Sequence, residues 1–305
     1  MSGAHFSARQ LVLLALLTLV WGLNWPIMKF GVTHFPPLSF RALSMWLGLP
    51  VLYLAVRAMR IPLAIERSQW PELARLTFTN MIVWHVLAIV SVQALSSGRA
   101  AILGYTMPVF SALWGMALFG QRLSGRQLAG VAAAAIGVAL LLWHELGRMA
   151  GKPWAAGGML VSAAVWALGT QQLRRTRMTA PTLAIVFWMT VVTTLVMTLL
   201  AAAFEQPRWQ MPSPEVWATI VFNAVLIFGF AQPVWLYLAR ALPPVASTLS
   251  VMLIPVLGTL SGAWWLNEQL HWQDFAAIVL MLAAIASVLL PARAAAPAQS
   301  ARPST

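Results

Sequence analysis

The chain has no cysteine among its 305 residues, and charged residues make up only 9% of it. The absence of cysteine excludes disulfide bonds, thiol catalysis and cysteine-ligated metal sites. Acidic residues are scarcest, with 7 Asp and Glu against 19 Lys and Arg. A water-soluble domain carries about 25% charged residues, so the shortage of charge excludes a water-soluble body.

Hydrophobic residues make up 60% of the chain, in runs that recur along its whole length. Each run approaches the ~20 residues that an α-helix needs to cross a bilayer. Ten such spans are predicted, at residues 11–33, 38–58, 71–94, 99–119, 125–144, 154–173, 181–203, 214–238, 245–266 and 273–291. The predicted fold class is therefore all-α, a polytopic membrane protein with ten transmembrane helices.

Basic residues are distributed unevenly between the two sides of the membrane. With the N-terminus in the cytoplasm, 13 of the 19 basic residues fall on the cytoplasmic side, where such residues are enriched. These are Arg9, Arg57, Arg60, Arg67, Arg75, Arg122, Arg126, Arg174, Arg175, Arg177, Arg240, Arg293 and Arg302. Both termini are therefore predicted to be cytoplasmic, and the net charge of +12 requires no nucleic-acid partner.

The two halves of the chain match each other. An offset of 147 residues pairs 101–109 with 248–256, and an offset of 145 pairs 20–21 with 165–166. Each half has five spans, an odd number, so the second half enters the membrane from the opposite side, which predicts two inverted five-helix repeats. The predicted domains are a first repeat at 8–145, a second repeat at 153–292 and a disordered cytoplasmic tail at 293–305.

Each matched segment carries a proline inside an apolar run, Pro108 in the first half and Pro255 in the second. Proline removes a helical hydrogen bond and frees backbone carbonyls that lipid cannot satisfy. Interrupted spans at matched positions of two halves are a pointer to a transporter's binding site. We therefore expect both spans to be interrupted and to border a central site.

Short motifs recur in the same order in both halves. The motifs of the first half are 21–24 (Trp-Gly-Leu-Asn), Lys29, 36–37 (Pro-Pro), Arg41, 108–109 (Pro-Val) and 119–123 (Phe-Gly-Gln-Arg-Leu). Those of the second half are Pro255, 267–270 (Asn-Glu-Gln-Leu) and Asp274. Their order resembles the EamA-type family of the drug/metabolite transporter superfamily. The resemblance implies a ten-helix carrier of the bacterial inner membrane, usually an exporter of amino acids or other small metabolites.

One position departs from the family pattern. The family commonly has a glutamate after the fourth span, where this chain has Gln121, whereas the second half keeps Glu268. A glutamate required for ion coupling in both halves would make this loss serious. We favour a structural interpretation, in which Glu268 caps a helix or pairs with a basic group at the membrane edge.

No carboxylate is predicted at mid-depth, because every Asp and Glu falls at or near the end of a span. Neutral or weakly titratable side chains, aromatic residues and the two prolines lie there instead. The predicted substrate-binding residues are Trp21, Asn24, Trp25, His85, Tyr105, Pro108, Trp166, Thr170, Gln232, Ser250 and Pro255. An aromatic, weakly polar chamber of this kind suits zwitterionic or uncharged solutes with an apolar part.

Each of these polar residues has a structural alternative, because Asn, Gln and Thr also hold membrane helices together. His85 has three open roles, as a proton carrier, as a solute or gating contact, or as a plain hydrogen-bond partner. Arg41 and Arg99 are predicted close to the outer side of the membrane, where each is expected to snorkel to the interface. A second role is open for Arg99, which begins the fourth span, namely attraction of a solute carboxylate at the outer mouth.

The sequence favours a secondary transporter that works by alternating access around a midplane site and exports small metabolites such as amino acids. Its predicted partners are a small-molecule solute and the lipid bilayer, with protons open as the coupling ion and no cofactor. A multidrug exporter of the same fold is the first alternative. An intramembrane lipid-acting enzyme is the second, but it needs clustered His, Asp or Glu, so we predict no enzyme activity.

Overall fold

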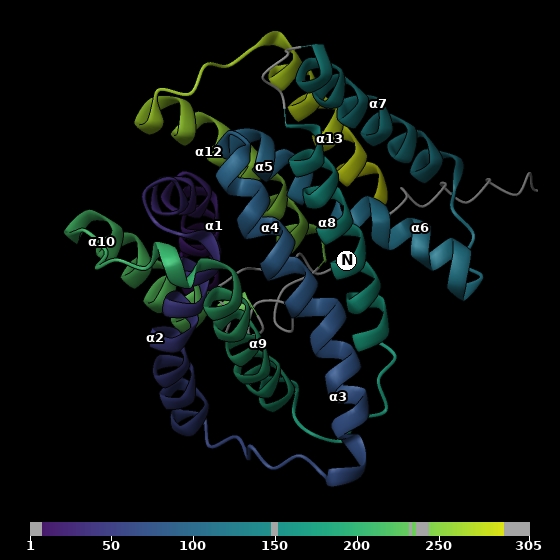
Figure 1. Cartoon of the computed structure of the whole chain (residues 1–305). Helices are drawn as coiled ribbons and strands as arrows, with labels where there is room; N and C mark the ends of the chain where they lie inside the picture. The colour runs from purple at the N-terminus through teal and green to yellow at the C-terminus, as the bar shows by residue number, and fades with distance from the viewer. Residues whose placement is uncertain (1–7, 148–151, 232–233, 236–243, 290–305) are drawn as a thin grey trace, which may run out of the picture.

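The computed structural model describes residues 8–147, 152–231, 234–235 and 244–289. Every regular element in these ranges is a helix (Figure 1). Helices occupy the positions of all ten predicted spans, and six of them are long and apolar enough by themselves to cross a membrane. The prediction of an all-α polytopic membrane protein is confirmed.

The two repeats follow one another along the chain. The helices of the first repeat are α1 (Ala8–His34), α2 (Pro37–Ala58), α3 (Trp70–Thr77), α4 (Val83–Ala94), α5 (Ser97–Gly104), α6 (Met107–Phe119) and α7 (Gly125–Gly147). The helices of the second repeat are α8 (Pro153–Leu173), α9 (Thr182–Glu205), α10 (Pro214–Phe222), α12 (Pro244–Leu266) and α13 (Trp272–Leu289).

Wider π-helical turns occur in the third span of each repeat. They are η2 (Phe78–Ile82), which joins α3 to α4, and η4 (Asn223–Ala231), which continues α10. Such turns disturb the regular hydrogen-bond ladder and are frequent at functional sites. Two short 3₁₀ turns, η1 (Arg67–Gln69) and η3 (Gln206–Arg208), precede α3 and follow α9.

The two matched prolines have different effects on their helices. The fourth span is divided into α5 and α6 at Tyr105 and Thr106, and Pro108 is the second residue of α6. Proline is tolerated there because the first N–H groups of a helix have no partner within it. In contrast, α12 runs through Pro255 without a break. The prediction that the span is interrupted at Pro255 is therefore wrong. The proline removes a single hydrogen bond, and the hydrogen bonds of the neighbouring turns keep the helix continuous.

Equivalent helices of the two repeats make equivalent contacts with the opposite repeat. Helix α1 packs against α12, and its counterpart α8 packs against α5 and α6. The pairs α2–α9 and α7–α13 each join a helix to its own counterpart, and α7 and α13 run side by side at one edge of the bundle (Figure 1). With five spans in each half, this arrangement is that of two inverted five-helix repeats.

The turn that follows α6 has the same backbone conformation as the turn that follows α12. Gly120 and Asn267 both lie in the left-handed region, with φ of 64° and 52°. Glycine enters this region freely, and asparagine enters it more readily than most other residues. The two positions are 147 residues apart, so the sequence offset marks a repeated turn.

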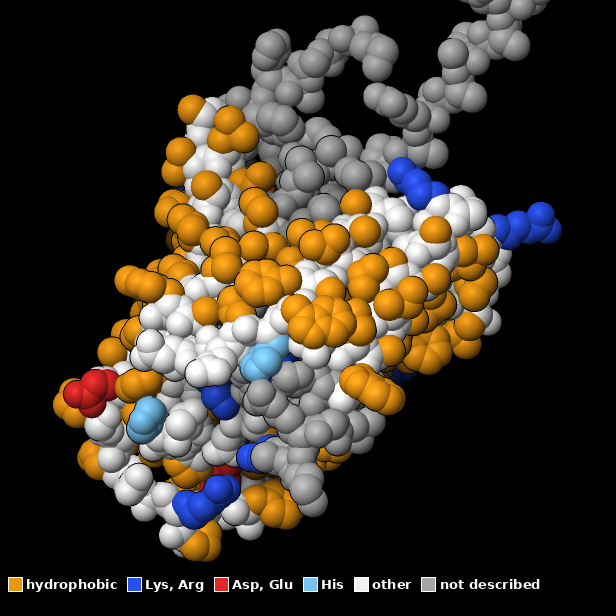
Figure 2. Space-filling view, turned by 90° about the horizontal axis from the view of Figure 1, so that it is seen from above, with side chains coloured by type: hydrophobic (Ala, Val, Ile, Leu, Met, Phe, Trp, Pro, Cys, Tyr) orange, Lys and Arg blue, Asp and Glu red, His pale blue; other side chains and the backbone are white. Residues whose placement is uncertain are grey.

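The outer surface of the bundle is apolar. Figure 2 shows hydrophobic side chains over much of the face drawn, with charged side chains toward its margins. Trp264 is 85% exposed, Trp143 76% and Leu199 70%. Water-soluble proteins rarely expose contiguous apolar surface of this extent, so lipid is the medium that this surface fits.

Candidate functional site

A buried arginine, Arg41, lies near the start of α2 with 5% of its surface exposed. Its Nη1 donates to Asn223 Oδ1 over 3.4 Å, and its Nη2 donates to Met28 Sδ over 2.8 Å. Its Cζ lies 5.9 Å from the centre of the Phe228 ring. The expectation that Arg41 snorkels to the membrane interface is wrong, because the side chain turns inward to α1 and η4.

Arg41 has no acidic partner among the described residues. Its Nε is buried and makes no hydrogen bond. A guanidinium group remains charged at any physiological pH. Burying a charge without a partner costs several kcal/mol, so this arginine is not explained as a packing residue.

Asn24 Oδ1 and His85 Nδ1 are also buried without a hydrogen-bond partner, as is Gln273 Oε1 near the start of α13, at the end of a span. The imidazole ring of His85 lies 5.9 Å from the Phe228 ring, centre to centre, so Phe228 contacts both His85 and Arg41. Asn24 precedes Met28 by one helical turn, on the same face of α1. We define the polar centre as Asn24, Arg41, His85, Asn223 and Phe228.

The polar centre lies about halfway along α1, α4 and the span of α10 and η4, and Arg41 reaches it with its side chain from the first turns of α2. Asn24 is about 15 Å from the C-terminal end of α1, and His85 is about 14 Å from that of α4. These ends lie together, because Lys29 Nζ donates to Gln93 O over 2.7 Å. Asn223 is about 14 Å from the start of α10, which packs along α1. Half of a hydrocarbon core is about 15 Å, so the centre is at membrane mid-depth.

Aromatic residues from both repeats pair in the interior of the bundle. The distances between ring centres are 6.3 Å in Trp25–Tyr105, 6.4 Å in Trp84–Trp166 and 5.5 Å in Trp21–Trp235. A Cβ atom at Gly104 would lie 2.9 Å from the Trp25 indole, so glycine makes room for this ring. Sequence reasoning missed Trp84 and Trp235, because neither has an aromatic counterpart in the other half.

The other predicted site residues have local roles or lie outside the described part of the chain. Thr170 Oγ1 donates to Trp166 O over 3.0 Å, a bond within one turn of α8. Pro255 is buried inside α12. Gln232 lies outside the described residues, and so does the side chain of Ser250. Of the predicted residues, the structure brings Trp25 and Tyr105 into contact, and it places Asn24 and His85 on α1 and α4, two helices that pack against each other.

Glu205, the last residue of α9, holds the start of α2. Its Oε1 accepts a hydrogen bond from Leu38 N over 3.0 Å, and its Oε2 accepts bonds from Ser39 N and Ser39 Oγ, both over 2.7 Å. The free N–H groups and the dipole at a helix N-terminus stabilise a carboxylate there. Glu205 thereby anchors the turn that carries Arg41.

Glu268 holds the start of α5 in the same way. Its Oε1 accepts from Ser97 N and its Oε2 from Ser97 Oγ, both over 2.7 Å. Arg99 Nε, in the same turn, donates to Asp274 Oδ1 over 2.8 Å. The prediction that Glu268 caps a helix is confirmed, whereas the expectation that Arg99 snorkels is wrong because its charge is paired. We refer to Glu205, Glu268 and Asp274 as the acidic rim.

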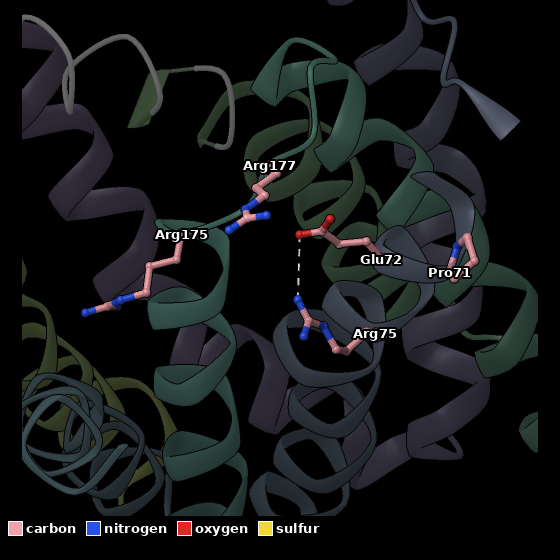
Figure 3. Close-up of a pocket in the computed structure, with 5 residues that line it drawn as sticks. All are labelled: Pro71, Glu72, Arg75, Arg175 and Arg177. Carbon is pink, nitrogen blue, oxygen red and sulfur yellow. Dashed lines mark ion pairs between the residues drawn. The ribbon is translucent and has the colours of Figure 1, made fainter. Parts of the chain in front are cut away.

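Two hollows open on the surface at the ends of spans, away from the polar centre. The first, of about 440 Å³, is lined by Pro71, Glu72, Arg75, Arg175 and Arg177 (Figure 3). Arg75 pairs with Glu72 over 3.6 Å, whereas Arg175 points away, with its Cζ 3.8 Å from the centre of the Phe119 ring. The second, of about 320 Å³, lies beside Lys29, Arg99 and Glu268. An exposed ion pair such as Arg75–Glu72 contributes little energy, and we assign neither hollow a transport role.

Ten membrane spans in two inverted repeats, with unsatisfied polar groups at mid-depth, define a class of protein, the membrane transporter with a central site. The EamA-like transporter family matches residues 9–143 and 153–290 of this sequence. The family model matches once in each repeat, so the chain belongs to the EamA-like transporter family. The resemblance inferred from its motifs is confirmed.

Relatives of known name agree with this assignment. The chain is 24% identical over 257 residues to the uncharacterized transporter YoaV of Bacillus subtilis, covering 83% of this chain and 87% of that protein. It is 25% identical over 287 residues to the uncharacterized inner membrane transporter YedA of Escherichia coli, covering 90% and 88%. A solved crystal structure has the same fold, with a TM-score of 0.66, 21% identity and coverage of 94% and 97%. The protein is a multi-pass membrane transporter.

Proposed function

We propose that the protein is a secondary transporter that exports small metabolites such as amino acids by alternating access around the polar centre. One observation carries this proposal: buried atoms of Asn24, Arg41 and His85 have no hydrogen-bond partner. A structural core satisfies its buried polar atoms, whereas a binding site presents them to its ligand. The direction of export and the class of metabolite rest on the family resemblance.

The proposed mobile walls of the site are the spans that contain Pro108 and Pro255. The break between α5 and α6 places Tyr105 beside Trp25, and α12 packs against both α1 and α5. Exchange of conformation between two inverted repeats opens a central site first to one side and then to the other. We therefore assign Trp21, Trp25, Tyr105, Trp166 and Thr170 to the solute path, with Gln232 and Ser250.

Proline replacement tests the mobile walls. We expect Pro108→Ala and Pro255→Ala to slow transport while leaving membrane insertion unchanged. Pro255→Ala restores a missing hydrogen bond inside α12, and Pro108→Ala removes the fixed proline φ at the start of α6, next to the break. Rates of uptake into membrane vesicles, normalised to the amount of inserted protein, measure the effect. Wild-type rates in both variants would contradict these walls.

We further propose that both termini are cytoplasmic, which places the acidic rim on the outer side. Because the chain has no cysteine, a single introduced thiol reports its own side of the membrane. A membrane-impermeant maleimide should label Met211→Cys in intact cells and Arg67→Cys only after lysis. The reverse pattern would contradict the orientation without affecting the fold.

Export is tested by comparing cells that lack the protein with cells that produce it. Producing cells should hold less of at least one amino-acid-like metabolite and release more of it to the medium. Each metabolite found is then tested in vesicles with and without a pH gradient, which decides whether protons couple to transport. Unchanged levels across a broad metabolite panel would count against export.

A further inference from the structure

The guanidinium group of Arg41 has an unused edge. Nε–H and an N–H of Nη2 point in parallel and form the fork that binds a carboxylate through two hydrogen bonds. In the described part of the chain, Nε has no partner and Nη2 meets the thioether of Met28, which is a weak acceptor. The opposite edge is engaged, since Nη1 donates to Asn223.

The charge of Arg41 also lacks compensation inside the protein. Glu205 approaches the same turn of α2, but its oxygens already accept bonds from Leu38 and Ser39 at the helix start. A buried charge without a partner is strongly unfavourable, and a ligand of opposite charge relieves that cost. The free fork and the uncompensated charge therefore point to the same kind of ligand.

Other basic side chains of the first repeat do not share this feature. Arg99 is paired with Asp274 over 2.8 Å, and Lys29 Nζ donates to the carbonyl of Gln93. Both lie near the ends of their spans, whereas Arg41 reaches Asn223 and Phe228 at mid-depth. Arg41 is thus the basic group placed to meet a solute in the polar centre.

We propose that Arg41 binds the carboxylate of the transported solute, so that the protein selects small solutes with one carboxylate and an apolar body. This inference rests on the proposed function. The carboxylate takes Nε and Nη2 and displaces Met28 Sδ. Asn24 and His85 face the other polar atoms of the solute, and the rings of Trp25 and Phe228 face its apolar part.

A carboxylate fits the polar centre better than a phosphate does. Among the described residues of the centre, Arg41 alone carries a full charge, which matches a single negative charge. A phosphate group carries a charge of about −1.5 to −2 and three acceptor oxygens, and it requires more than one cation or several further donors. Inorganic phosphate therefore serves as a contrasting probe.

The test uses the purified full-length chain in lipid nanodiscs with two matched pairs of probes, phenylacetate with phenylacetamide and isovalerate with isovaleramide. Binding is measured from the thermal shift and from tryptophan fluorescence. The carboxylates should bind and the amides should bind more weakly. Arg41→Gln should weaken carboxylate binding roughly 10- to 100-fold, the effect of losing charged hydrogen bonds, and should abolish the preference. Arg41→Lys keeps the charge without the fork and should bind with intermediate affinity.

Arg99→Gln is the matched control, because it removes a paired arginine outside the polar centre. It should keep the preference for carboxylate over amide. The inference is overturned if wild type binds acid and amide equally, binds neither carboxylate, or prefers inorganic phosphate. A preference that survives in Arg41→Gln also overturns it. If the glutamine variant does not fold, Arg41→Lys decides instead, and wild-type carboxylate affinity in that variant overturns the inference.

Flux measurements in proteoliposomes separate this inference from the proposed function. Faster flux of phenylacetate than of phenylacetamide supports both. Equal flux of acid and amide leaves the transporter standing and contradicts the carboxylate site. Carboxylate binding that depends on Arg41, without flux of any probe or metabolite, supports the site and contradicts transport through it.

Discussion

Two arginines in the first repeat, Arg41 and Arg99, are held in opposite ways. Arg99 lies in the first turn of α5 and pairs with Asp274 of the other repeat over 2.8 Å. Arg41 lies near the start of α2, is 5% exposed, and contacts an amide, a thioether and a ring but no carboxylate among the described residues. The charge of Arg99 is compensated by Asp274 within the folded chain, whereas no carboxylate of the described residues compensates the charge of Arg41. The acidic rim therefore has a structural role, whereas the polar centre is the site that we propose for the solute.

Of the substitutions that test this difference between the two arginines, one at Asp274 should change the free energy of unfolding most. Asp274→Asn leaves the charge of Arg99 without its partner and weakens the acceptor for His271 N, which now donates over 2.8 Å. Loss of one member of a buried ion pair should lower the free energy of unfolding by about 3 kcal/mol. Thermal denaturation in nanodiscs measures this. Glu66→Gln, at an exposed position, is the control, and an equal melting temperature in both variants would show that the rim is not structural.

A smaller loss is expected at Glu205. Glu205→Gln keeps the size of the side chain but removes the charge that Leu38 N and Ser39 N donate to. The helix dipole and the charged hydrogen bonds together should be worth about 2 kcal/mol. The same thermal assay applies. An unchanged melting temperature would mean that α2 is held by packing alone.

The fold was predictable because its signals are local or periodic. Apolar runs marked the ten spans, and the 147-residue offset marked the repeats, down to the matched turns at Gly120 and Asn267. The site was only partly predictable. The sequence predicts Arg41 to be an interfacial residue because it is close to a span end. In the structure its side chain points inward and contacts Asn223, which is 182 residues away in the sequence. No short pattern encodes such a contact, and the same holds for Glu205 as the cap of α2.

A change of opposite sign is expected when Arg41 itself is removed. Arg41→Met replaces an uncompensated buried charge with an apolar side chain of similar length, so unfolding should require about 1 kcal/mol more. Transport should be lost in the same variant. Arg99→Met is its counterpart and should lower the melting temperature. If both variants are destabilised equally, the two arginines are not held differently.

The smallest effect is expected at Gln121, which occupies the position of Glu268 in the other repeat. The two turns share their backbone and their capping pattern, since Ser124 N donates to Gln127 Oε1 as His271 N does to the Asp274 carboxylate. Gln121 is exposed, so Gln121→Glu should change the free energy of unfolding by less than about 0.5 kcal/mol. The melting temperature should therefore shift only slightly. A large gain would reveal an incomplete cap at this end of the bundle.

The most direct test of the central claim is the accessibility of the polar centre in a chain that has no cysteine of its own. A single thiol in Asn24→Cys should react with an impermeant methanethiosulfonate reagent from either side of membrane vesicles, and phenylacetate should slow the reaction. Leu199→Cys, on the lipid-facing surface, should react from neither side. Labelling of Asn24→Cys that fails from one or both sides, or that phenylacetate leaves unchanged, would contradict a solute site reached alternately across the membrane.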